Sequence, residues 1–104
     1  MVNMSRIYYL NNGHAVGLEF AVSEKTGRIH NAFLTYYDEN MPDGKLIPLV
    51  LELDDVTRME LAETALDGMF DAGFKVTKRV ETLFKLWLES EIDRELWPID
   101  GKIE

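Results

Sequence analysis

Four carboxylates in one stretch of this chain have the types and the spacing to do chemistry together. Glu60, Glu63, Asp67 and Asp71 recur at intervals of three, four and four residues. On an α-helix these intervals place all four side chains in a single stripe, where like charges repel by a few tenths of a kcal/mol per pair. A basic surface on another protein would turn that repulsion into attraction, so the stripe is a candidate binding site. A solvated face kept acidic for solubility is the alternative interpretation.

Groups for catalysis or metal binding are scarce. The chain has two histidines and no cysteine, so the usual metal-ligand spacings cannot be built. His14 falls in a predicted turn, and His30 falls in a predicted strand, where a surface or partly packed imidazole is the ordinary role. The acidic loop at 38–43 lacks the spacing of an EF-hand. We therefore predict a protein that is not an enzyme and has no catalytic, cofactor or metal site.

Size and charge narrow the choice of partners. The chain has 104 residues, 46% of them hydrophobic, which predicts a single domain over 1–104 with a real core. The formal net charge of −8 argues against direct binding to nucleic acid or to an anionic membrane, since both need a basic footprint. The lack of cysteine favours the cytoplasm, and no apolar run approaches the roughly 18 residues of a membrane-spanning helix.

Alternation of apolar and polar residues dominates the first half of the chain. It predicts strands at about 5–10, 15–22, 28–37 and 46–53. The pair Asn12-Gly13 between two apolar runs is a strong hairpin signal, and a two-residue turn there would set Tyr9 opposite Val16. We expect the four strands to form an antiparallel meander, with Pro48 favouring an edge position for the last strand.

The predicted hairpin register divides the sheet into two faces. The face toward the helices would carry Ile7, Tyr9, Val16, Leu18, Phe20, Ile29 and Phe33. On the outer face, Arg6 would pair with Glu19, and Tyr8, Leu34 and Tyr36 would form a candidate contact patch. Tyrosine suits such a patch because its ring buries area while its hydroxyl finds a hydrogen bond. An ordinary scatter of apolar side chains on a sheet surface is the alternative.

A helical periodicity replaces the strand pattern in the second half. We predict helices at about 55–72 and 77–97. Asp54 or Asp55 can cap the first helix, and Gly73 can end it. Thr77 can cap the second helix, which Pro98 stops. The predicted fold class is therefore α+β, a four-stranded antiparallel meander followed by two helices packed on one face of the sheet.

The second predicted helix carries more apolar surface than one neighbour can cover. Its apolar residues, which cover roughly 240° of the helix, are Val80, Leu83, Phe84, Leu86, Trp87, Leu88 and Ile92. We expect the first helix to cover part of this surface through its small residues Ala65, Gly68 and Ala72. A partner chain would cover the rest, including Trp87, and a homodimer is the simplest arrangement that provides one.

These features lead to two main functional hypotheses. The first is a non-enzymatic inhibitor whose acidic stripe imitates a run of phosphates and blocks the basic, nucleic-acid-binding surface of a partner protein. Immunity proteins of nuclease toxins and phage proteins that block host defence complexes act in this way. The alternative is a structural or assembly subunit, a homodimer or adaptor that uses the apolar second helix and the tyrosine-bearing sheet face. An enzyme that uses Asp and Glu as acid and base is a third hypothesis, and it lacks a catalytic constellation.

Overall fold

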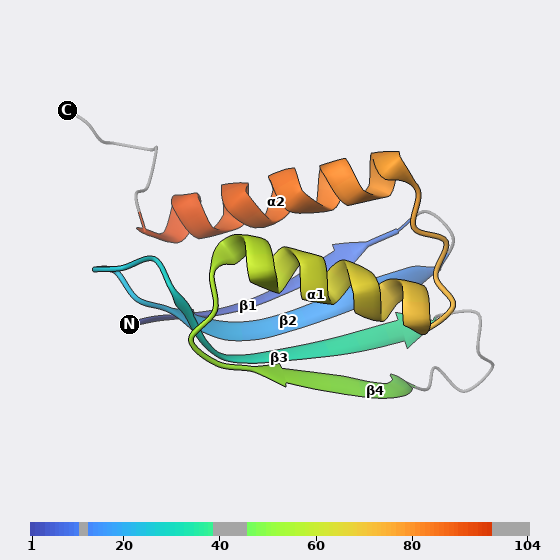
Figure 1. Cartoon of the computed structure of the whole chain (residues 1–104), viewed down its shortest axis with the longest axis horizontal. Coiled ribbons are helices and arrows are strands. Elements are labelled where there is room, and N and C mark those ends of the chain that lie inside the picture. Colours follow the sequence, from blue (N-terminus) through green and yellow to red (C-terminus); the bar gives the residue numbers. More distant parts are fainter. Residues whose placement is uncertain (11–12, 39–45, 97–104) are drawn as a thin grey trace.

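A four-stranded antiparallel sheet covered on one face by two helices forms the fold (Figure 1). The computed structural model describes residues 1–10, 13–38 and 46–96. Its elements are β1 (Val2–Tyr9), β2 (His14–Val22), β3 (Ile29–Asp38), β4 (Leu46–Leu53), α1 (Arg58–Asp71) and α2 (Lys78–Leu96). The strands lie side by side in chain order, α1 packs over β3 and β4, and α2 packs over β1. The predicted fold class is confirmed.

The core lies between the sheet and the helices. Its larger members are Val16, Leu18 and Phe20 of β2, Leu34 and Tyr36 of β3, Leu61 and Met69 of α1, and Phe84, Leu88 and Ile92 of α2. Alternate residues of a strand share one face, and residues four apart share one side of a helix. The apolar residues at these two periods therefore meet in one buried layer.

The first hairpin differs from the prediction by one residue. The register of β1 with β2 pairs Tyr8 with Val16, Arg6 with Leu18 and Met4 with Phe20. The Leu10 N–H donates to the His14 carbonyl at 2.8 Å, so the hairpin closes on a longer loop than a two-residue turn. Asn12 of the predicted turn lies outside the described residues.

That one-residue difference turns every side chain of β1 to the other face of the sheet. Ile7 and Tyr9, predicted to face the helices, are 46% and 65% exposed. Tyr8 instead lies on the helix side. Arg6 also lies on the helix side, opposite Leu18, so the predicted ion pair with Glu19 is wrong.

A bulge in β3 explains a second error of the face assignment. The pairs Glu19–Phe33 and Ala21–His30 leave one extra residue on β3 in that interval. Asn31 has a φ of 51°, in the left-handed region, and its N–H donates to Asp54 Oδ1 at 3.1 Å. Because an extra residue reverses the alternation of faces, the parity of β3 differs on the two sides of Asn31.

The buried residues of β3 follow that reversal. Ile29, before the bulge, is buried as predicted, whereas Phe33, after it, is exposed. Leu34 and Tyr36 point toward the helices and are fully buried. The predicted outer patch of Tyr8, Leu34 and Tyr36 is therefore wrong, because all three lie on the helix side of the sheet.

The start of α1 also differs from the prediction. Thr57 is the N-cap, since its hydroxyl oxygen accepts a hydrogen bond from the Glu60 N–H at 3.1 Å. Asp54 accepts instead from the bulge at Asn31, and Asp55 holds Arg28 through a 2.6 Å ion pair. Both aspartates thus fix the connection between β4 and α1 and do not cap the helix.

Two other helix ends follow the prediction, and Pro98, predicted to stop the second helix, lies outside the described residues. Gly73 ends α1 with a φ of 91°, and the Phe74 N–H donates to the Met69 carbonyl at 2.9 Å, which closes the last turn. Thr77 caps α2 by accepting a hydrogen bond from the Val80 N–H at 3.2 Å. Neither helix of the described chain is long and apolar enough to span a membrane.

Candidate functional site

The four carboxylates predicted to form a stripe lie on α1, and all four side chains are exposed. Glu60 accepts a hydrogen bond from the Thr57 hydroxyl at 3.1 Å. Glu63, Asp67 and Asp71 form no hydrogen bond or ion pair with any other residue of the described chain. We call these four residues the α1 stripe.

The buried face of α1 explains why the α1 stripe faces solvent. The buried residues of the helix are Leu61, Ala62, Ala65, Leu66, Gly68 and Met69. Their intervals of three and four match the helical period, so the carboxylates are left on the other side of the helix. The helix is thereby held with its acidic side outward.

Contact between Gly68 and Tyr36 fixes how close α1 lies to the sheet. The Tyr36 hydroxyl donates to the Ala65 carbonyl at 3.1 Å. A Cβ at position 68 would overlap that hydroxyl and the ring carbon bearing it, so only glycine fits. The small residues Ala65, Gly68 and Ala72 were predicted to face the second helix, and this is wrong for Gly68, which lies over Tyr36.

The pKa of Tyr36 depends on its burial and on the charges of α1. Burial, and then the negative charges of Asp71 and Asp67, raise the pKa of Tyr36 from 10.0 to about 12. Burial disfavours the phenolate, and neighbouring carboxylates add repulsion. The tyrosine predicted to contact a partner is instead an internal support for the helix that carries the α1 stripe.

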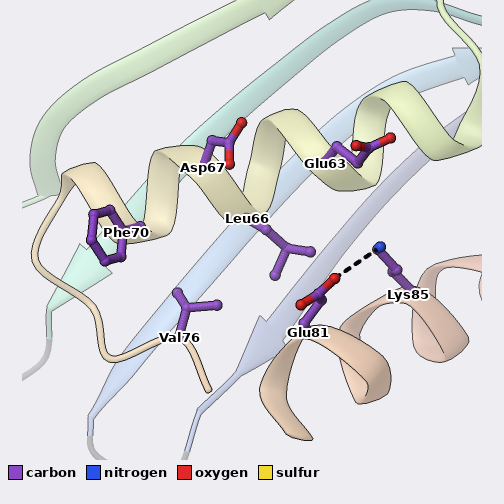
Figure 2. Close-up of a pocket in the computed structure, with 7 residues that line it drawn as sticks. All are labelled: Glu63, Leu66, Asp67, Phe70, Val76, Glu81 and Lys85. Atoms are coloured by element: carbon purple, nitrogen blue, oxygen red, sulfur yellow. Dashed lines mark hydrogen bonds and ion pairs between the residues drawn. The ribbon is translucent and has the colours of Figure 1, made fainter. Parts of the chain in front are cut away.

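A groove of about 240 Å³ runs beside the α1 stripe, between α1 and α2. Its lining residues are Glu63, Leu66, Asp67, Phe70, Val76, Glu81 and Lys85. Figure 2 shows Leu66 and Val76 between the two helices, with Glu63 and Asp67 on the α1 side. On the α2 side Lys85 donates to Glu81 at 3.1 Å, and this hydrogen bond holds the pKa of Glu81 below its usual value.

This groove has the chemistry to hold a basic side chain. Glu63 and Asp67 offer free carboxylates at the edge of the groove, and Leu66 and Val76 offer an apolar floor. In Figure 2 the Asp67 carboxylate points to the side of α1 away from Leu66. Arginine and lysine combine an apolar stem with a cationic head, and the exposed ring of Phe70 can pack on a guanidinium. The cation already in the groove, Lys85, is held by Glu81, so the carboxylates on α1 stay available.

Tyr8 and Trp87, two residues of the predicted contact surfaces, pack against each other inside the structure. The Tyr8 ring lies 5.1 Å from Trp87 and 5.2 Å from Phe84, measured between ring centroids. Burial raises the pKa of Tyr8. Trp87 is half-buried, so only part of its side chain is available to a partner.

Acidic residues of α2 are mostly used within the protein. Arg6 of β1 donates to Glu91 at 2.7 Å and also to Glu95, and Arg58 of α1 donates to Asp93 at 2.6 Å. The hydrogen bond to Glu91 is the main reason that the pKa of Arg6 is raised. Sequence reasoning missed this role of Arg6, because the role depends on the face to which β1 turns.

The apolar excess predicted for the second helix is present on its outer flank. Leu83 and Leu86 are exposed, whereas Phe84, Leu88 and Ile92 are fully buried in the core. This flank lies beside the end of β1, where Leu83 lines a shallow groove together with Tyr9. It is a second surface that a partner could cover.

Histidines show no arrangement that suggests catalysis. His14 stacks on Phe74, with ring centroids 4.0 Å apart, and His30 Nδ1 lies 3.3 Å from Asp54 Oδ1. Within the described ranges, no three His, Asp or Glu side chains gather as metal ligands would. Comparison with protein-family models, with curated proteins and with solved structures finds no match to this chain. A function must therefore be argued from geometry and charge.

Proposed function

We propose that the protein is a non-enzymatic inhibitor that binds the basic, nucleic-acid-binding surface of another protein through the α1 stripe. The observation that carries the proposal is the contrast between free and paired acids. Glu63, Asp67 and Asp71 are exposed and have no ion-pair partner in the described chain, although each costs the helix some repulsion. A binding surface explains why such charges are grouped.

The spacing of the α1 stripe supports recognition of arginine. Helix neighbours three or four residues apart lie roughly 5–6 Å from one another, so a guanidinium can bond to one carboxylate or bridge two. The groove next to Glu63 and Asp67 adds an apolar floor for the stem of such a side chain. The net charge of −8 would also speed encounter with a basic partner.

The proposal fits two biological settings, both in the cytoplasm. One is the immunity partner of a nuclease toxin, and the other is a phage protein that blocks a host defence complex. In each setting a basic groove that normally holds nucleic acid must be covered. The shared chemistry is an acidic surface offered to a basic one, without direct contact between this protein and nucleic acid or membrane.

Affinity capture with charge-matched variants tests the proposal. The tagged protein should retain a basic, nucleic-acid-binding protein from host extract, and Glu63→Lys/Asp67→Lys should lose it. The control Glu52→Lys/Glu89→Lys changes the net charge equally at exposed acids outside the α1 stripe and should retain it. Equal loss in both variants would mean that net charge alone governs binding.

A structural or assembly subunit remains the second candidate, because Leu83 and Leu86 stay exposed on α2. An apolar contact there would resist salt, whereas binding by the α1 stripe should weaken steeply as salt is added. The assembly function would be favoured if capture survives high salt. It would also require that Leu83→Glu abolishes capture and that Glu63→Lys/Asp67→Lys does not.

A further inference from the structure

Two edges of the sheet differ in how well they are protected. β4, at one edge, contains Pro48, and its register with β3 shifts between Thr35 and Tyr36. Proline and irregular pairing both discourage a further strand from adding to an edge. β1, at the other edge, contains no proline and keeps an unbroken register with β2 along all 8 of its residues (Figure 1).

Backbone geometry shows which groups of β1 point outward. The hydrogen bond from the Leu10 N–H to the His14 carbonyl marks a hydrogen-bonded pair, so even-numbered residues of β1 bond to β2. Odd-numbered residues, which are Asn3, Ser5, Ile7 and Tyr9, therefore direct their N–H and C=O groups away from the sheet. In the described chain no backbone group pairs with them, and Ser5 O accepts a side-chain bond from Arg6 at 3.0 Å.

Charge does not protect this edge either. The single charged residue of β1, Arg6, turns onto α2 and is neutralised by Glu91 and Glu95. The exposed side chains of Ile7 and Tyr9 add apolar surface on the open face of the sheet beside the edge. An edge that is long, regular, uncharged and apolar favours pairing with another strand.

We propose that β1 pairs antiparallel with β1 of a second copy of this chain, joining the two sheets into one continuous sheet. A strand that pairs antiparallel with itself is related by a two-fold axis, so both copies use the same surface. The acidic α1 stripe lies over β3 and β4, at the other side of each sheet, so this dimer keeps the two stripes apart. A second copy of this chain suits the edge for two reasons: the edge is neutral, and the two acidic α1 stripes stay apart in the dimer.

Register of the dimer follows from the same geometry. Only odd-numbered residues point outward, so odd residues must pair with odd residues. A register centred on Arg6 would set two guanidinium groups side by side, which costs energy. Registers centred on Ser5 and on Ile7 both avoid this, and the Ser5 register pairs more of β1, residues 2–8 instead of 5–9. It sets Ile7 of each copy opposite Asn3 of the other. The inference goes beyond the proposed function, because both α1 stripes stay free to bind.

Sedimentation of the wild type and of two Ser5 variants tests the dimer. The wild type should sediment at twice the 12.0 kDa of one chain at high micromolar concentration. Ser5→Pro removes an outward N–H that β2 does not use, so it should yield a folded monomer, whereas Ser5→Ala keeps the N–H and should remain a dimer. A wild type that stays monomeric, or a Ser5→Pro variant that stays dimeric, would overturn the proposal.

Cross-linking provides a measurement that does not depend on proline. The chain contains no cysteine, so Ser5→Cys introduces a unique thiol next to the proposed two-fold axis. A short bis-maleimide should join two copies of Ser5→Cys efficiently and leave the exposed control Glu63→Cys unlinked. If Ser5→Pro fails to fold, the cross-linking result alone decides whether the dimer forms through β1. Equal cross-linking of both cysteine variants would overturn the proposal.

Discussion

Both helices of this protein are rich in acidic residues, and they use them differently. On α2, Glu91 and Glu95 hold Arg6, Asp93 holds Arg58, and Glu81 holds Lys85. On α1, the three acids from Glu63 onward have no ion-pair partner in the part of the chain that the structure describes. Similar side chains thus stabilise the fold on one helix and remain available on the other.

Position in the fold causes this difference. Three acids of α2 lie where the helix meets β1 and α1, and each of those elements supplies an arginine: Arg6 for Glu91 and Glu95, and Arg58 for Asp93. Within the α1 stripe, Glu63 and Asp67 line the groove toward α2, but the cation of that groove, Lys85, is paired with Glu81. A count of charges in the sequence cannot separate these two groups, whereas their burial and partners can.

Gly68→Ala should disturb the support beneath the α1 stripe. The new Cβ would overlap the Tyr36 hydroxyl, so α1 or the tyrosine must move, at a cost of about 3 kcal/mol in the free energy of unfolding. Urea denaturation measures this loss. Adding Tyr36→Phe removes the overlapping oxygen and should recover part of the stability. If the stability losses of Gly68→Ala and Tyr36→Phe simply add in the double variant, the contact does not set the position of α1.

Arg6→Met should show that the acids of α2 are structural. Glu91, whose side chain is 12% exposed, would lose its hydrogen bond, and unfolding should become about 2 kcal/mol easier. Arg79→Met is the matched control, since Arg79 is exposed and forms no ion pair within the described ranges, and it should change stability by less than about 0.5 kcal/mol. If both variants lower the melting temperature equally in thermal denaturation, the acids of α2 have no special structural role.

Tyr36 should make the fold sensitive to alkali. Its pKa in the folded protein is raised from 10.0 to about 12, so the native state favours the neutral phenol. The stability from this group is fully present below pH 10.0 and is lost as the pH rises toward about 12. Tyr36→Phe should be less stable at neutral pH, because the bond to Ala65 is lost, yet should show a smaller alkaline loss. Parallel alkaline profiles of the two proteins would contradict this account.

Reversing charges should affect the two helices in opposite directions. Glu63→Lys/Asp67→Lys relieves repulsion within the α1 stripe and should raise stability by a few tenths of a kcal/mol. Glu91→Lys would place a cation against Arg6 and should lower the stability of the fold. A clear loss of stability in the first variant would show that the α1 stripe has an internal role.

Much of the fold follows from sequence patterns, and the errors have identifiable causes. The change of period after residue 53 and the end signals at Gly73 and Thr77 are local, so they predict the order of the elements and two of the helix ends. The hairpin register and the bulge at Asn31 are not local signals, because each depends on pairing with another strand. Each shifts parity by one residue, so the predicted inner and outer faces are exchanged in β1 and in the part of β3 after Asn31, whereas β2 follows the prediction.

The candidate site shows the same division. The α1 stripe is predicted correctly as an exposed feature because helical periodicity alone places it. The tyrosine patch fails because it relied on the parity of β1 and β3. Its members Leu34 and Tyr36 are buried in the core, and the pairing of Arg6 with α2 could not be foreseen without knowing that parity.

Calorimetric titration with an arginine-rich peptide tests whether the α1 stripe binds basic side chains. We expect Glu63→Lys/Asp67→Lys to raise the Kd of the peptide about tenfold or more relative to wild type, since two charge-assisted contacts are lost. The charge-matched Glu52→Lys/Glu89→Lys should raise it by no more than about twofold, through net charge alone. Equal Kd values for the two double variants would contradict the claim that the free carboxylates of α1 form the binding surface.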